Sequence, residues 1–147
     1  MNPLDLLPHR PPMRLLDEIL DLDAGARARG RRVLRDDDFF FDGHFPDEPI
    51  VPAVILVEML AQVGGLAAAA PVDAQADGAT IRLRVAGLGP FKFPAAARPG
   101  DTLEVSARVA GRLGGLYKIE GEVTAGDRIV ATGSVTLGAA PTPIPVS

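Results

Sequence analysis

The pattern of hydrophobic and polar positions divides the chain into two mixed parts separated by one long apolar stretch. From Ile50 to Val72 the one charged residue is Glu58, and all others except one Gln are apolar, small or Pro. A helix that is apolar on every side is normally buried on every side. The pattern therefore predicts a core helix, about 27 Å long, that begins near Val51 or Pro52 and ends near Ala69.

A membrane-spanning helix is the rival interpretation of this stretch. It is disfavoured by the short length, by the carboxyl group of Glu58, by the Gly64-Gly65 pair and by the Pro-rich entry. The N-terminus also lacks the charged and then apolar pattern of a signal peptide. We therefore expect a cytoplasmic protein that does not enter a membrane.

Alternation of apolar and polar residues predicts strands after the helix. Before the helix, periodicity alone does not distinguish helix from strand over Met13 to Asp23. After the helix, Gly114-Gly115 marks a hairpin, and a bulge or break is expected at 87–90. The four strands predicted there are Thr80–Ala86, Thr102–Leu113, Leu116–Val123 and Arg128–Leu137.

Two strands, one buried helix and four strands predict an α+β fold, in which a curled antiparallel sheet wraps around one long central helix. A single domain is expected over residues 1–147, with a flexible Pro-rich tail at 138–147. The apolar content of 47% is sufficient for a core built mainly from Leu, Val, Ile and Ala. The formal net charge of −4 gives no indication of nucleic-acid binding. The absence of Cys excludes disulfides, thiolate nucleophiles and Cys-ligated metals.

Two side chains near the start of the apolar stretch carry candidate chemistry. His44 lies in a loop stiffened by Pro46 and Pro49, and Glu58 follows on the predicted helix. Apolar surroundings disfavour a charged carboxylate, so Glu58 is a candidate general acid and His44 a candidate general base. A lone His near aromatic residues more often has a structural role, so both interpretations stay open at this point.

The segment GHFPDEPIVPAVILVEMLAQ, residues 43–62, resembles the signature of the 3-hydroxyacyl-[acyl-carrier-protein] dehydratases of type II fatty acid synthesis. The opening LLPHRPPMRLLDEIL and the later RPGDTLEV resemble two further segments of that family. The resemblance extends from Leu4 to Leu137. It implies a single hot-dog domain, in which residues 13–23 form a strand that continues, after a turn at Ala24-Gly25, into a second strand over Arg27 to Leu34.

The same resemblance implies an activity, namely dehydration of a (3R)-3-hydroxyacyl thioester on acyl carrier protein to the trans-2-enoyl thioester, without cofactor or metal. In this family, the residue at His44 removes a C2 proton, and the residue at Glu58 of the neighbouring subunit donates a proton to the leaving hydroxyl. The resemblance therefore also implies a homodimer or a trimer of dimers, in which two subunits complete each site.

Further site residues follow from the resemblance. The N–H of Ala53 corresponds to a family Gly N–H that binds the thioester oxygen, and Gln62 matches a family Gln expected to help hold the acid. Phe45 and Val54 are expected to contact the substrate, with plain core packing an equal alternative for Val54. His9 matches the family's P-H-R segment and is expected to make a structural hydrogen bond.

The run of five Arg and three Asp in residues 27–38 allows two interpretations. One is a solvated edge strand protected by charge, and the other is a docking patch for the acidic carrier protein. The sequence departs from the family at Ala53, whose Cβ can crowd the thioester, and at 94–96, where a basic pair is replaced by Pro-Ala-Ala.

Three alternative functions stay open. They are a hot-dog acyl thioesterase, a specialised dehydratase of a secondary pathway, and a non-catalytic subunit that binds acyl carriers. The loop around His44 argues against a thioesterase, because attack by water does not need that His. The presence of both His44 and Glu58 argues against a non-catalytic subunit.

Overall fold

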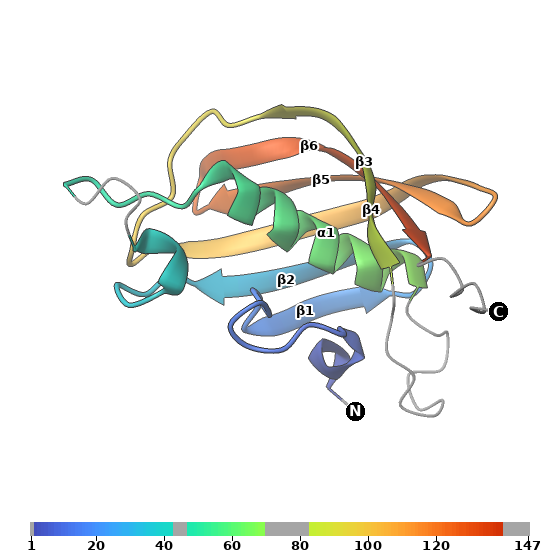
Figure 1. Ribbon diagram of the computed structural model, residues 1–147, viewed down its shortest axis with the longest axis horizontal. Coiled ribbons are helices and arrows are strands. Elements are labelled where there is room, and N and C mark those ends of the chain that lie inside the picture. The colour runs from blue at the N-terminus through green and yellow to red at the C-terminus, as the bar shows by residue number, and fades with distance from the viewer. Residues whose placement is uncertain (1, 43–46, 70–82, 140–147) are drawn as a thin grey trace, which may run out of the picture.

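The computed structural model describes residues 2–42, 47–69 and 83–139 (Figure 1). In chain order its elements are the 3-10 helix η1 (Pro3–Leu6), β1 (Glu18–Asp23), β2 (Arg27–Val33), the 3-10 helix η2 (Phe39–Phe41), α1 (Ala53–Ala69), β3 (Leu83–Lys92), β4 (Thr102–Leu113), β5 (Leu116–Ala125) and β6 (Arg128–Ala139). The predicted order of two strands, one long helix and four strands is confirmed.

The six strands form one antiparallel sheet in the order β1-β2-β4-β5-β6-β3. This sheet curls around α1, which lies across its inner side (Figure 1). The helix packs most closely on β4, with further contacts to β2 and β5. The predicted hot-dog arrangement, a curled antiparallel sheet around one central helix, is therefore confirmed.

Burial of α1 changes along its length. Residues 59–68 are all buried, whereas Ala53 and Val54 in the first turn are exposed. The prediction of a helix buried on every side is therefore right for the later turns and wrong for the first. Within the described residues, no helix combines the length and hydropathy that a membrane span requires.

Gly64 lies at a close approach of the helix to the sheet. A Cβ atom at Gly64 would lie 2.7 Å from Cγ2 of Ile119, a fully buried residue of β5. A Cβ atom at the neighbouring Gly65 would meet no such atom within 4 Å. Packing therefore requires glycine at position 64 but not at position 65, because a larger side chain at 64 would force the helix and β5 apart.

The first predicted strand is shorter than expected. It was predicted over residues 13–23, but β1 begins at Glu18. The carbonyl of Met13 and the N–H of Leu15 bond instead to the side chain of Gln62 on α1. Because these backbone groups already have partners, residues 13–15 do not extend the strand. Asn2 caps the 3-10 helix η1, since its Oδ1 accepts the N–H of Leu4 at 3.1 Å.

The prediction that the arginine-rich strand is an edge strand is wrong. β2 lies between β1 and β4, and its outward arginines form ion pairs with both neighbours. Arg29 pairs with Asp21 of β1 and Glu104 of β4, each at 2.6 Å, and Arg31 pairs with Glu18. Hydrogen bonds to the Glu104 and Asp21 carboxylates raise the pKa of Arg29. Ion pairs therefore link β1, β2 and β4 on this face of the sheet.

The second half of the sheet follows the predicted turns with two corrections. Register shifts in β3 between Val85 and Gly87 and between Leu88 and Phe91 confirm the expected bulge at 87–90. The strand continues through it to Lys92, past its predicted end at Ala86. Residues 80–82 of the predicted strand lie outside the described residues. The predicted tail starts too early, because β6 continues to Ala139; residues 140–147 lie outside the described residues.

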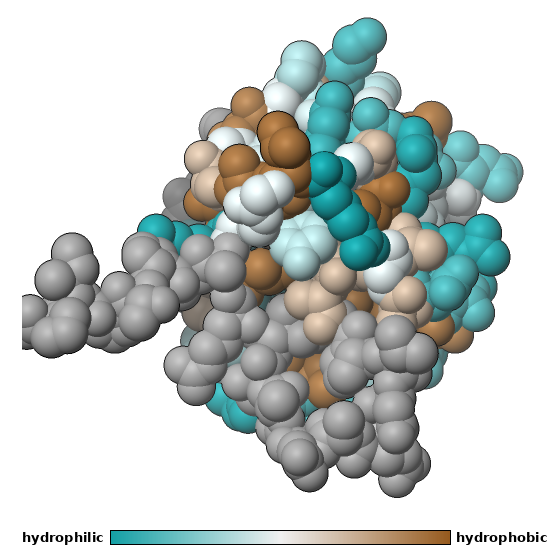
Figure 2. Space-filling view, turned by 90° about the vertical axis from the view of Figure 1, so that its right-hand side faces the viewer, coloured by the Kyte–Doolittle hydropathy of each residue, from teal (hydrophilic) through white to brown (hydrophobic). Residues whose placement is uncertain are grey.

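The predicted hairpin at Gly114-Gly115 is confirmed. The two glycines join β4 to β5 with φ angles of 55° and 81°, which favour glycine. The hairpin projects at the right of Figure 1, and the flanking Leu113 and Leu116 are exposed. Figure 2 views the molecule from this side, where apolar and hydrophilic residues are mixed over the surface.

The two adjacent glycines of α1 should respond oppositely to the same substitution. In Gly64→Ala the new Cβ meets Ile119, which should cost about 1–3 kcal/mol of stability. The higher helix propensity of Ala offsets about 1 kcal/mol of that cost. Gly65→Ala should stabilise it by about 0.5–1 kcal/mol, since Ala is the better helix former. Denaturant unfolding of both variants measures the difference, and equal shifts in one direction would contradict the packing argument.

Candidate active site

The structure places four of the six predicted site residues. Ala53, Val54, Glu58 and Gln62 all lie on α1. The predicted base His44 and the predicted substrate contact Phe45 lie outside the described residues.

Glu58 lies on the helix between the exposed first turn and the fully buried turns. Its side chain is 29% exposed, so the carboxyl group reaches the surface of the described protein. Oε1 of Glu58 lies 3.4 Å from Nε2 of His9 and 3.5 Å from Nε2 of Gln62. The carboxyl group is therefore next to two nitrogen-bearing side chains, although its sequence neighbours are apolar.

His9 is brought to the helix by the N-terminal segment. The buried side chains of Leu6 and Leu7 anchor this segment in the core. The carbonyl of His9 accepts hydrogen bonds from Arg10 at 2.9 Å and from Arg14 at 3.3 Å. The backbone of His9 is thus held by two guanidinium groups, and its imidazole is directed to Glu58. The sequence predicted only a structural hydrogen bond for His9, and its contact with Glu58 was missed. The P-H-R motif was the one signal that could have pointed to this contact.

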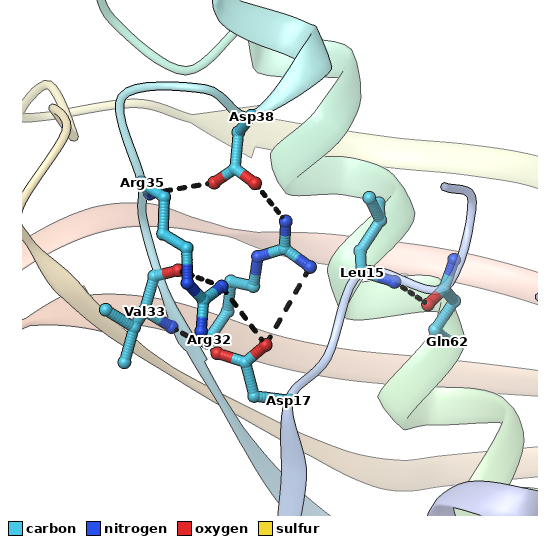
Figure 3. A network of polar contacts seen from close by, with 7 residues as sticks. All are labelled: Leu15, Asp17, Arg32, Val33, Arg35, Asp38 and Gln62. Atoms are coloured by element: carbon cyan, nitrogen blue, oxygen red, sulfur yellow. Dashed lines mark hydrogen bonds and ion pairs between the residues drawn. The ribbon is translucent and has the colours of Figure 1, made fainter. Parts of the chain in front are cut away.

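Gln62 joins the N-terminal segment to the helix. Its Oε1 accepts the N–H of Leu15 at 3.0 Å (Figure 3). Its Nε2 donates to the carbonyl of Met13 at 2.7 Å. The residue is 1% exposed. A buried amide of this kind is retained because it satisfies backbone groups that would otherwise be unpaired. Its predicted role in holding Glu58 stays a prediction, which the 3.5 Å contact supports.

The first turn of α1 lies at the surface of the described protein. The first N–H groups of a helix have no acceptor within the helix, and they favour a partial negative charge on a ligand. Ala53 and Val54 lie here, and Val54 is 73% exposed. Val54 therefore does not pack in the core, so the alternative to substrate contact that the sequence left open for this residue is wrong.

A charged network supports the segment that leads to residue 43. Asp38 accepts from the Arg32 guanidinium at 2.5 Å and from the N–H of Arg35 at 2.9 Å (Figure 3). The side chains of Asp38 and Arg32 are 9% and 11% exposed, so the pair is nearly buried. Asp38 precedes η2, but its carboxylate makes no capping bond to that helix because Arg32 and Arg35 occupy it. The network also includes Asp17, which accepts the N–H of Val33 at 2.7 Å.

A separate hollow of about 1000 Å³ lies over the sheet, and its lining includes none of the four described site residues. Arg29, Arg108 and Glu120 are among its lining residues. Arg108 and Glu120 form an ion pair, so the charges facing this hollow largely balance one another. Among the described residues, no group of three His, Asp or Glu side chains could hold a metal ion.

Comparison with known proteins identifies similar sequences. Residues 7–134 match the family model of the FabA-like domain. The 3-hydroxyacyl-[acyl-carrier-protein] dehydratase FabZ of Caldanaerobacter subterraneus subsp. tengcongensis is 39% identical over 127 residues, which cover 86% of this chain and 87% of the relative. The protein of the same name from Natranaerobius thermophilus is 33% identical over 132 residues, covering 90% of each chain.

Similar solved structures support the fold. A chain of the dehydratase heterocomplex ApeI:P from Xenorhabdus doucetiae superimposes with a TM-score of 0.81, at 17% identity, covering 96% of this chain and 92% of that chain. The PaaI protein of Escherichia coli gives a TM-score of 0.61 at 16% identity, covering 82% and 80% of the two chains. At these identities, the similarity concerns the fold alone.

Removing the Asp38 carboxylate should lower the free energy of unfolding. We expect Asp38→Asn to lower the free energy of unfolding by about 2–4 kcal/mol, because it leaves the nearly buried Arg32 without its counter-charge. Asp37→Asn is the matched control, because the exposed Asp37 has no ion-pair partner among the described residues. Urea unfolding measures both variants, and a shift of less than 0.5 kcal/mol, the range of ordinary surface substitutions, for Asp38→Asn would contradict the structural role.

Proposed function

Because the chain belongs to the family of FabA-like domains, we propose that it dehydrates (3R)-3-hydroxyacyl thioesters on acyl carrier protein to trans-2-enoyl thioesters in fatty acid biosynthesis. The curated relatives named as 3-hydroxyacyl-[acyl-carrier-protein] dehydratases support this, since the similarity covers most of both chains. The observation that carries the proposal is the position of Glu58, a surface-reaching carboxyl group and the one charged side chain of a mostly apolar helix.

In the proposed mechanism, His44 takes the proton from C2 of the substrate as the base. Glu58 of the partner subunit donates a proton to the 3-hydroxyl group, and the C3–O bond breaks to release water. Negative charge develops on the thioester oxygen as the C2 proton leaves. The N–H of Ala53 in the exposed first turn of α1 is suited to stabilise that charge.

The proposed assembly is a homodimer formed through β3, or a trimer of such dimers. β1 and β3 are the two edges of the sheet. On β3 the apolar Val85 and Leu88 are 40% and 65% exposed, which favours pairing at this edge. Such pairing would let each site combine residues of two subunits.

The assay that tests the proposal follows two products at once. Purified protein is given 3-hydroxybutyryl and longer 3-hydroxyacyl thioesters on carrier protein, and ultraviolet absorbance reports the conjugated enoyl product. Free thiol is measured in parallel. We expect enoyl product without thiol. Thiol release without enoyl product would establish the thioesterase alternative and remove the role of His44 as base.

Substitution of the two proposed catalytic residues should abolish this activity. We expect His44→Ala and Glu58→Gln each to lower kcat by about 100- to 10,000-fold, the usual contribution of a general acid or base. Glu122→Gln is the matched control, since this exposed carboxylate lies on β5 away from the site. Size-exclusion chromatography should show the same assembly for all variants. A kcat within threefold of the unmodified protein for either variant would make the assigned role wrong.

A further inference from the structure

The two nitrogen contacts of Glu58 fall on the same carboxyl oxygen. His9 Nε2 and Gln62 Nε2 both approach Oε1, at 3.4 and 3.5 Å. Among the described residues, no hydrogen bond or ion pair involves Oε2. We propose that His9 is a positioning residue that donates its Nε2–H to Oε1 of Glu58, which leaves Oε2 to carry the proton for the leaving hydroxyl. The inference rests on the proposed role of Glu58 as the acid.

The surroundings of the imidazole assign its proton to Nε2. A neutral imidazole carries one N–H, on either Nδ1 or Nε2. Nδ1 of His9 is buried and has no hydrogen-bond partner among the described residues, whereas Nε2 faces the carboxyl oxygen. A proton on Nδ1 would be a buried donor without an acceptor, which is rare because it loses its bond to water. The N–H is therefore best placed on Nε2, directed at Glu58.

The second donor is fixed by the backbone. Gln62 gives one amide hydrogen to the carbonyl of Met13, and its oxygen receives the N–H of Leu15. Turning the amide over would break both bonds and place two oxygens together. The amide nitrogen is therefore held toward Glu58, and its second hydrogen is available to Oε1. Two N–H groups from different parts of the chain thus select the same oxygen as the acceptor.

This arrangement assists the release of the proton. While Glu58 is protonated on Oε2, Oε1 is a carbonyl oxygen that accepts two neutral hydrogen bonds. When the Oε2–H bond breaks and the proton passes to the 3-hydroxyl group, the negative charge spreads over both oxygens. The bonds to Oε1 then become charge-assisted, and therefore shorter and stronger. An interaction that strengthens as the reaction proceeds raises kcat more than it changes substrate binding.

Distances of 3.4 and 3.5 Å agree with this sequence of events, because catalytic hydrogen bonds are often long before substrate is bound. The imidazole is also not what holds the N-terminal segment in place. The buried side chains of Leu6 and Leu7 anchor this segment in the core, and Gln62 binds its backbone at residue 13. The ring of His9 can therefore be replaced without removing these anchors.

Three substitutions of His9 separate a donor at Nε2 from a ring that only packs. His9→Gln places an amide N–H near the position of Nε2, His9→Asn places one near Nδ1, and His9→Phe keeps a ring without any donor. We expect His9→Phe and His9→Asn to lower kcat by about 10- to 100-fold with KM changed less than threefold. His9→Gln should stay within about threefold of the unmodified protein. Equal kcat for the Gln and Asn variants would overturn the proposal.

A change of leaving group gives a measurement that does not depend on the fraction of folded protein. A 3-chloroacyl thioester on the same carrier loses chloride, which needs no proton, whereas the C2 proton must still be removed. The ratio of the 3-hydroxyacyl rate to the 3-chloroacyl rate should fall about 10- to 100-fold in His9→Phe. An unchanged ratio would mean that His9 does not act on the acid.

The unmodified protein in the same experiment separates the two hypotheses. If it forms no enoyl product from 3-hydroxyacyl thioesters, the proposed dehydratase function is overturned, and the role of His9 is overturned with it. If it forms the product and His9→Phe keeps its kcat and its ratio, the role of His9 alone is overturned.

Discussion

The burial of α1 inside the curled sheet is the constraint on which the rest of the structure depends. Met59, Leu60, Val63 and Leu66 are fully buried, and each such side chain contributes about 1.5–3 kcal/mol. An exposed ion pair contributes at most about 1 kcal/mol. The core therefore fixes the helix, and the helix fixes Glu58. A shift of the helix would move the acid relative to every group that it has to meet.

The candidate site is assembled from parts that have little connection in sequence. α1 supplies the carboxyl group and its exposed first turn supplies N–H groups, while the N-terminal segment supplies the imidazole. Gln62 couples the two, since its buried amide binds the backbone of residues 13 and 15 and approaches Glu58. The Asp38–Arg32 ion pair likewise fixes a second segment of the chain, the one that precedes residue 43. Polar groups that stabilise the fold therefore also place the chemistry.

Much of the fold could be predicted from local patterns. The unbroken apolar stretch predicted the helix nearly to its ends, and alternation with Gly-Gly predicted the β4–β5 hairpin, because these signals reside within a few residues. The errors came from contacts between distant residues. The position of β2 within the sheet depends on pairing with β4, and the late start of β1 depends on Gln62. In the site, the motif singled out Glu58, but the approach of His9 became visible only once the two segments were packed together.

The cross-strand ion pairs of β2 have a consequence for how other proteins meet this surface. Arg29 and Arg31 each lie between or beside carboxylates, so these two arginines of the basic run add little net charge to the sheet. The electrostatic potential of such alternating charges falls off rapidly with distance, and salt screens it within about 8 Å. An approaching acidic protein would therefore not be steered to this face during diffusion. Its rate of encounter there would depend on collision and close fit, and would change little with ionic strength.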